Sequence, residues 1–171
     1  VAKSKSVMSI KVRYIYSACI TVETIDCKIL CDPWFTEGAY DGSWFQFPKV
    51  KNPLEIIGDV DAIFISHIHP DHYDSLFIKD YFERYGTKKI YIANHKPNYL
   101  FYKMMSDNLV PTIINEAEGI QIDKTKIMVF PHKTGSKSDI DSALSVTFND
   151  GKRSHCVLNV NDIIVDESFL K

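Results

Sequence analysis

The stretch FISHIHPDHYD, residues 64–74, contains three of the chain's six histidines. His67 and His69 are two positions apart, and residues with this spacing in an extended segment point to the same side. Pro70 favours extended geometry for His69, the residue before it, which supports that orientation. The pattern therefore predicts that the two imidazoles bind one metal ion.

Asp71 and His72 continue the pattern, but two adjacent side chains do not easily face the same ion. We expect them to bind a second ion a few ångströms away. Imidazole and carboxylate groups form a ligand set typical of zinc, and iron and manganese also accept it. Chance clustering of histidines is the simple alternative. A closed structural zinc site is disfavoured, because such sites prefer cysteine ligands and none lies nearby.

The residues around this cluster predict its place in the fold. Ala62–Ile65 is an unbroken apolar run, typical of a central strand that is covered on both faces. The cluster follows at the carboxyl end of this strand, where ligand sites of α/β sheets gather. Asp74 is suited to cap a helix that extends to about Tyr85 and stops at Gly86.

The remaining segments predict more strands than helices. Residues 9–24 read as two strands, 25–32 as a third and 88–94 as another, and a second helix is expected near Pro97. Beyond residue 111 the chain returns to strands, with the NDG tripeptide at 149–151 as a hairpin turn. This order favours a sheet-rich α/β domain with helices outside.

The bulk properties limit the possible partners. The 171 residues predict one domain over 8–171, with residues 1–7 an added or frayed start before Met8. A net charge of −2 argues against nucleic-acid binding, which needs a basic face. No apolar run approaches the roughly 20 residues of a membrane span, and no signal peptide is evident. The four cysteines form no C-x-x-C pair, which predicts reduced thiols in a cytoplasmic protein.

The spacing of the histidines and Asp71 resembles the hallmark of the metallo-β-lactamase-fold superfamily. The resemblance implies an α/β fold, an αββα sandwich of mixed sheets with helices outside. It also implies two later metal ligands, each just past an apolar strand. His132 would be the third ligand of the first ion, and Asp162 would be the carboxylate that bridges both ions.

Within the superfamily, the chain is most similar to the lactonase-like branch, and there to the metallo-β-lactamase-like part of CMP-N-acetylneuraminate hydroxylases. The similarity spans about residues 9–165 and rests on ILCDPWF, the GSW that follows, ISHIHPDH, KKIYIANHKPNYL and SDIDSALSV. These hydroxylases carry a Rieske iron–sulfur domain, whose paired Cys and His ligands do not occur in this sequence, so hydroxylation is not implied. YSAC at 16–19 also stands where the branch has a GHAS-like element.

The family pattern ends with a metal-binding histidine well beyond Asp162, whereas no histidine follows His155. Either the chain is part of a longer protein or the second metal site lacks one ligand. We expect the former, with the fold incomplete at its C-terminal end.

The resemblance implies a metal-dependent hydrolase, in which a metal-bound hydroxide attacks an ester, lactone or phosphodiester and Asp71 orients the water and accepts its proton. The expected substrate is a small molecule, with a sugar- or nucleotide-containing compound as one option, and a homo-oligomer is compatible with the sequence. Two alternatives stay open. A diiron redox enzyme of the same fold is disfavoured, because such members have Glu where this chain has His69. The other is a non-catalytic or degenerate metal-binding module.

Residues 32–53 form a long loop of the kind that is usually functional in a compact domain. Its aromatic side chains either line the mouth of the site and bind a sugar or base, or pack the loop itself. These are Trp34, Phe35, Tyr40, Trp44 and Phe45. Asp32, at the start of the loop, either supports a ligand histidine or caps the turn.

Overall fold

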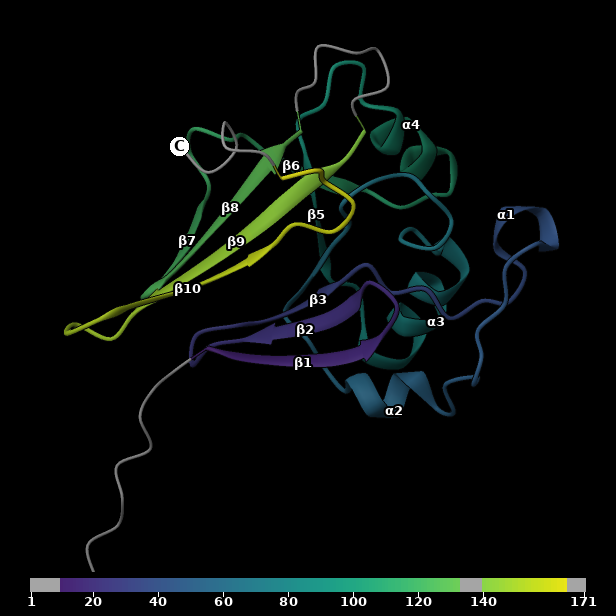
Figure 1. Ribbon diagram of the computed structural model, residues 1–171, viewed down its shortest axis with the longest axis horizontal. Coiled ribbons are helices and arrows are strands. Elements are labelled where there is room, and N and C mark those ends of the chain that lie inside the picture. The colour runs from purple at the N-terminus through teal and green to yellow at the C-terminus, as the bar shows by residue number, and fades with distance from the viewer. Residues whose placement is uncertain (1–9, 133–139, 166–171) are drawn as a thin grey trace, which may run out of the picture.

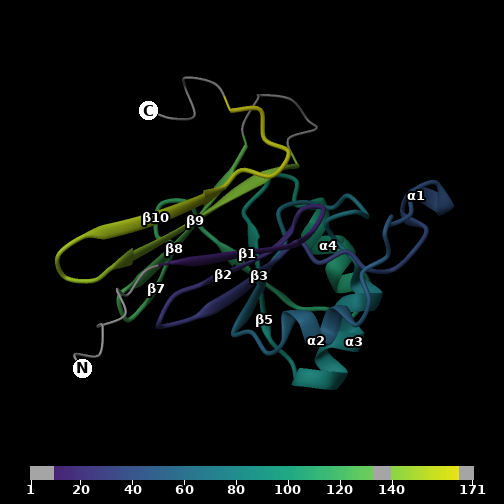
Figure 2. The ribbon, with the colours of Figure 1, turned by 60° about the horizontal axis from the view of Figure 1, so that its bottom comes forward.

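The computed structural model describes residues 10–132 and 140–165. Two β-sheets pack face to face, and helices cover the far side of the first sheet (Figures 1 and 2). This helix–sheet–sheet arrangement confirms the expected α/β class and forms three layers of the αββα sandwich. Within the described ranges, no helix lies on the outer face of the second sheet.

The first sheet is mixed. In spatial order its strands are β1 (Lys11–Tyr16), β2 (Cys19–Glu23), β3 (Lys28–Cys31), β4 (Ala62–Phe64), β5 (Lys89–Ala93) and β6 (Pro111–Ile114). β1, β2 and β3 pair antiparallel, whereas β3 to β6 run parallel. β4 therefore has a parallel neighbour on each side, as expected for a central strand.

The second sheet is an antiparallel meander. Its strands are β7 (Ile120–Ile122), β8 (Thr125–Pro131), β9 (Ser142–Asn149) and β10 (Ser154–Asn159). The predicted hairpin turn at 149–151 connects β9 to β10. Residues 120–131 form the β7–β8 hairpin, which turns at Asp123 with φ +44°.

Four helices are described: α1 (Ala39–Gly42), α2 (Pro53–Ile57), α3 (Ser75–Tyr85) and α4 (Tyr99–Ser106). α3 begins as predicted, because the Asp74 side chain accepts a hydrogen bond from the Phe77 backbone N–H at 2.9 Å. It ends at Gly86, whose φ of +80° is favourable for a residue without a Cβ atom. None of the described helices is long and apolar enough to cross a bilayer.

Side chains along β4 point alternately into the two hydrophobic cores, so the strand packs against the layers on both sides of it. Ile63 points into the core between the first sheet and the helices, where it lies with Phe77 and Tyr81 of α3. Its neighbours Ala62 and Phe64 point into the core between the two sheets. Because both faces of β4 are buried, the strand is held firmly, and so is the start of the segment that follows it.

Candidate metal centre

The histidine cluster lies in the connection from the end of β4 to the start of α3. Sheet pairing stops close to Ile65, whose N–H donates to the Tyr91 carbonyl at 3.1 Å. The chain then turns sharply, and the His69 carbonyl accepts hydrogen bonds from the backbone N–H groups of His72 and Tyr73. This turn brings residues 67–72 together beyond the carboxyl edge of the sheet, as the sequence predicted.

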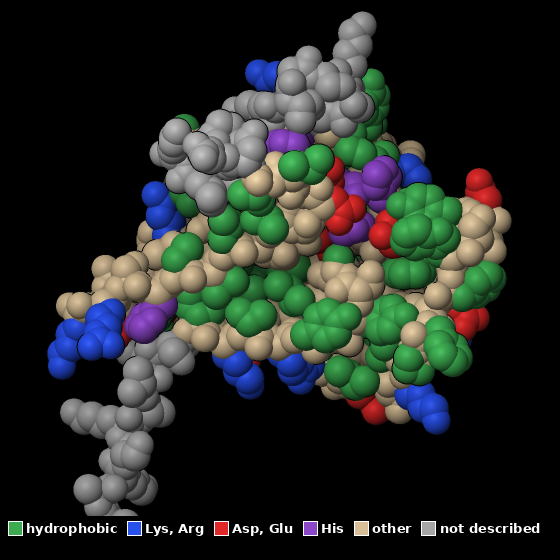
Figure 3. All heavy atoms as spheres, viewed as in Figure 1, with side chains coloured by type: hydrophobic (Ala, Val, Ile, Leu, Met, Phe, Trp, Pro, Cys, Tyr) green, Lys and Arg blue, Asp and Glu red, His purple; other side chains and the backbone are tan. Residues whose placement is uncertain are grey.

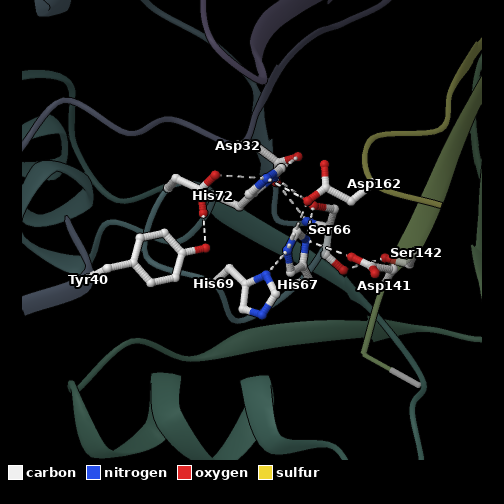
Figure 4. A network of polar contacts seen from close by, with 10 residues as sticks. Asp32, Tyr40, Ser66, His67, His69, His72, Asp141, Ser142 and Asp162 are labelled. Atoms are coloured by element: carbon white, nitrogen blue, oxygen red, sulfur yellow. Dashed lines mark hydrogen bonds and ion pairs between the residues drawn. The ribbon is translucent and has the colours of Figure 1, made fainter. Parts of the chain in front are cut away.

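His67, His69 and Asp162 offer three ligand atoms that all lie within 4.8 Å of one another. His67 Nε2 is 2.8 Å from His69 Nδ1 and 3.8 Å from Asp162 Oδ2 (Figure 4). Two nitrogen ligands of one tetrahedral Zn²⁺ lie about 3.3 Å apart, given metal–nitrogen distances of about 2.0–2.1 Å. The observed spacings lie on either side of that value, so the donor set fits a metal ion.

A second group adjoins the first through the same carboxylate. His72 Nε2 lies 3.5 Å from Asp162 Oδ2 and 3.5 Å from Asp71 Oδ2. Asp162 Oδ2 thus lies near the Nε2 atoms of both His67 and His72, although Asp162 comes from the segment after β10, about 90 residues later in the chain. This is the geometry that a bridging carboxylate needs.

Asp32 supports the cluster from behind. Its side chain is fully buried, with Oδ1 accepting the Ser66 N–H at 2.7 Å and Oδ2 lying 3.3 Å from His72 Nδ1. Because a carboxylate at Nδ1 fixes both the ring orientation and the tautomer, it leaves Nε2 of His72 facing the cluster. Of the two roles considered for Asp32, the support of a ligand histidine is therefore the one that its contacts favour.

Asp141 is a residue that sequence reasoning missed. It precedes β9, and its Oδ1 lies 3.0 Å from His67 Nδ1. Next to it, the Ser142 hydroxyl donates to the Ser66 carbonyl at 2.6 Å, which ties the second sheet to the end of β4. The sequence signal was weak: an acidic residue directly before an apolar strand, within the SDIDSALSV segment.

His132 lies at the end of β8, where its backbone N–H donates to the Asp141 carbonyl at 2.8 Å. The described residues form no group of metal-type ligand atoms that includes the His132 ring. Its role as third ligand of the first ion therefore stays a prediction, as do the metal-binding roles of the other cluster residues.

The charges in the cluster act unequally on its histidines. Burial and the neighbouring His67 lower the pKa of His69, which favours the neutral ring that a metal requires. Burial also lowers the pKa of His72, but the carboxylates around it, led by Asp32, outweigh this effect and raise the pKa above its ordinary value. Without a metal, His72 therefore holds a proton more readily than His69.

The aromatic loop divides into a buried part and an exposed part. Trp34 and Phe35 are buried and pack the loop, which answers the question of their role. Tyr40 and Trp44 form a ring pair with centroids 4.9 Å apart, and the Tyr40 ring centroid lies 6.1 Å from that of His69. On the face seen in Figure 3, histidine and carboxylate side chains gather beside a group of hydrophobic side chains.

A family model described as the beta-lactamase superfamily domain matches residues 11–158, which is most of the chain. The chain therefore belongs to this superfamily. Its fold is the metallo-β-lactamase fold that the resemblance implied.

Individual relatives agree with this assignment. A cytidine monophosphate-N-acetylneuraminic acid hydroxylase of Sus scrofa is 28% identical over 151 residues, which cover 85% of this chain and 33% of that protein. The crystal structure of a possible metal-dependent hydrolase from Veillonella parvula has a TM-score of 0.67 at 15% identity, covering 96% of this chain and 66% of that chain. CmlA, a diiron beta-hydroxylase from Streptomyces venezuelae, has a TM-score of 0.58 at 16% identity, covering 92% of this chain and 30% of that chain.

The two structural likenesses show the fold alone. The chain spans about a fifth to a third of the length of the curated relatives it matches.

Proposed function

We propose that the chain is the metal-binding part of a metal-dependent hydrolase, with zinc as the metal in one or two sites. The observation that carries the proposal is the convergence of His67, His69 and Asp162, whose ligand atoms lie within 4.8 Å of one another. His72 and Asp71 adjoin this group through Asp162 and would hold a second ion. When bound, such ions activate a water molecule as nucleophile and polarise a substrate oxygen.

The residues of the chain would position and assist this chemistry. Asp32 and Asp141 contact the outward nitrogens of His72 and His67, so that the opposite nitrogens face the centre. Asp71, whose Oδ2 lies 3.5 Å from His72 Nε2, would orient a water molecule and accept its proton as a general base.

We propose a small-molecule substrate with an ester, lactone or phosphodiester bond. Tyr40 and Trp44, beside the cluster, would contact a sugar or base portion of it, because such rings pack well on aromatic side chains. The net charge of −2 speaks against a nucleic-acid polymer. Free cysteines, of which Cys19, Cys27 and Cys31 are buried, are consistent with a cytoplasmic location, and a homo-oligomer is compatible with these features.

The test combines metal analysis with hydrolysis assays on a panel of chromogenic esters, lactones and phosphodiesters. The His67→Ala, His69→Ala double variant should lose bound zinc and turnover together. His155→Ala, on β10, is the matched control and should keep both. Full activity in the double variant would refute the hydrolase proposal. Zinc binding without turnover of any bond class would favour the non-catalytic module.

A diiron redox enzyme is the second candidate, because CmlA, a diiron beta-hydroxylase, shares this fold. His69 argues for zinc, because the diiron members have Glu at this position. Purified protein that contains iron, absorbs visible light and consumes oxygen would overturn the zinc proposal. Colourless protein with stoichiometric zinc would support it.

A further inference from the structure

The Tyr40 side chain reaches from the aromatic loop to the predicted metal ligand Asp71. The Tyr40 hydroxyl donates a hydrogen bond to Asp71 Oδ1 at 2.7 Å, while Asp71 Oδ2 lies 3.5 Å from His72 Nε2 (Figure 4). One oxygen of the Asp71 carboxylate therefore accepts a hydrogen bond from the loop, and the other faces His72.

The loop backbone adopts an unusual conformation to present this tyrosine. Tyr40 and the next residue, Asp41, have φ values of +54° and +55°, in the left-handed region. Residues other than glycine rarely adopt this conformation, so the surroundings must impose it. Hydrogen bonds between the backbones of Gly38, Ala39 and Trp44 close the loop around Tyr40 and maintain the conformation.

The same loop is anchored a second time to the turn that carries the cluster. Asp74 Oδ2 accepts the backbone N–H groups of Phe35 at 3.0 Å and Thr36 at 2.7 Å, and Asp74 Oδ1 accepts the Thr36 hydroxyl at 2.8 Å. The loop thus contacts both ends of the short segment from Asp71 to Asp74. Because the loop is attached at both points, the turn that carries the cluster holds the Tyr40 hydroxyl in place.

We propose that Tyr40 is a positioning residue for Asp71. Its hydroxyl occupies Oδ1 and holds the carboxylate in the orientation that offers Oδ2 to a metal ion, so that Asp71 binds through one oxygen. The inference rests on the proposed metal centre, since without a metal there is nothing for Asp71 to coordinate.

The test compares the Tyr40→Phe variant with the unaltered protein. The variant loses one hydroxyl and keeps the ring that packs against Trp44. We expect the site that includes Asp71 to bind Zn²⁺ about 10–100-fold more weakly, as for other residues that orient metal ligands, in a competition titration with a chromogenic chelator. With Co²⁺ in place of zinc, the visible absorption should change, because coordination by Asp71 changes. A purely structural role would not alter that spectrum.

Tyr14→Phe is the matched control. Tyr14 lies on β1 with an exposed side chain, and this variant should keep both the zinc affinity and the Co²⁺ spectrum. A Tyr40→Phe variant with unchanged affinity and spectrum would overturn the inference and leave the metal centre intact. Absence of zinc binding by the unaltered protein would instead overturn the proposed function and the inference together. The three proteins should unfold at the same temperature, which would show that neither substitution alters the fold.

Discussion

Replacing Asp74 with Ala should destabilise the protein more than any change at an exposed carboxylate. The side chain is buried and accepts four hydrogen bonds, which cap α3 and anchor the loop at Phe35 and Thr36. Loss of the helix cap costs about 1 kcal/mol. Each of the two backbone N–H groups in the loop loses a charged acceptor, worth about 1.5 kcal/mol at the low end of the range. We therefore expect a loss of about 4 kcal/mol in the free energy of unfolding.

Urea unfolding followed by circular dichroism measures this loss, and the thermal midpoint should fall by about 8–16 °C for a chain of this size. Asp80→Ala is the matched control, because Asp80 is an exposed carboxylate on the same helix and should change the free energy by less than about 0.5 kcal/mol. Asp74→Asn keeps one acceptor oxygen and should give an intermediate loss. A loss below about 1 kcal/mol in Asp74→Ala would refute the view that this carboxylate anchors the loop.

Three further predictions concern the cluster and the thiols. Asp32→Ala should weaken zinc binding about 10–100-fold in a chelator competition, because His72 loses its orienting partner; unchanged affinity would argue against that role. In the metal-free protein, the raised pKa of His72 stabilises the fold below the unfolded-state pKa of about 6.5, and this contribution is lost as the pH rises through the folded-state pKa. His72→Gln should therefore flatten the decline of the urea midpoint above about pH 6.5, and an equal decline in both proteins would contradict this. A thiol reagent should modify the exposed Cys156 rapidly and the three buried cysteines only after unfolding, whereas fast reaction of all four would show that the cores open readily.

Much of the fold was predictable because its signals are local. The apolar run at β4 predicted a strand buried on both faces, and Asp74 and Gly86 predicted the limits of α3. The short helices α1 and α2 gave no such signal, because four or five residues are too few to show an apolar stripe. α1 lies within residues 32–53, which read as loop in the sequence, and α2 begins at the end of that segment.

The candidate site likewise contains residues that the sequence predicted and residues that it did not. His67, His69, Asp71 and His72 were predicted together, because they lie within six positions and this short motif can be read without reference to the rest of the chain. Asp162 was expected from the superfamily resemblance, and its distances to His67 and His72 agree with that expectation.

Asp141 and the Tyr40–Asp71 hydrogen bond could not be predicted. Asp141 reaches His67 because the second sheet packs against the first, and that depends on the burial of apolar side chains between the sheets. Tyr40 reaches Asp71 because a loop in left-handed conformation is anchored to the turn at Asp74.

The sequence by itself determined the central strand and the spacing of the first metal-type ligands, since these depend on patterns of a few residues, and the same short motif carried the resemblance to the superfamily. Only the tertiary structure decided which distant groups orient those ligands. Contacts between residues 30 to 95 positions apart arise from the packing of sheets and the closure of loops, and neither leaves a short pattern in the sequence.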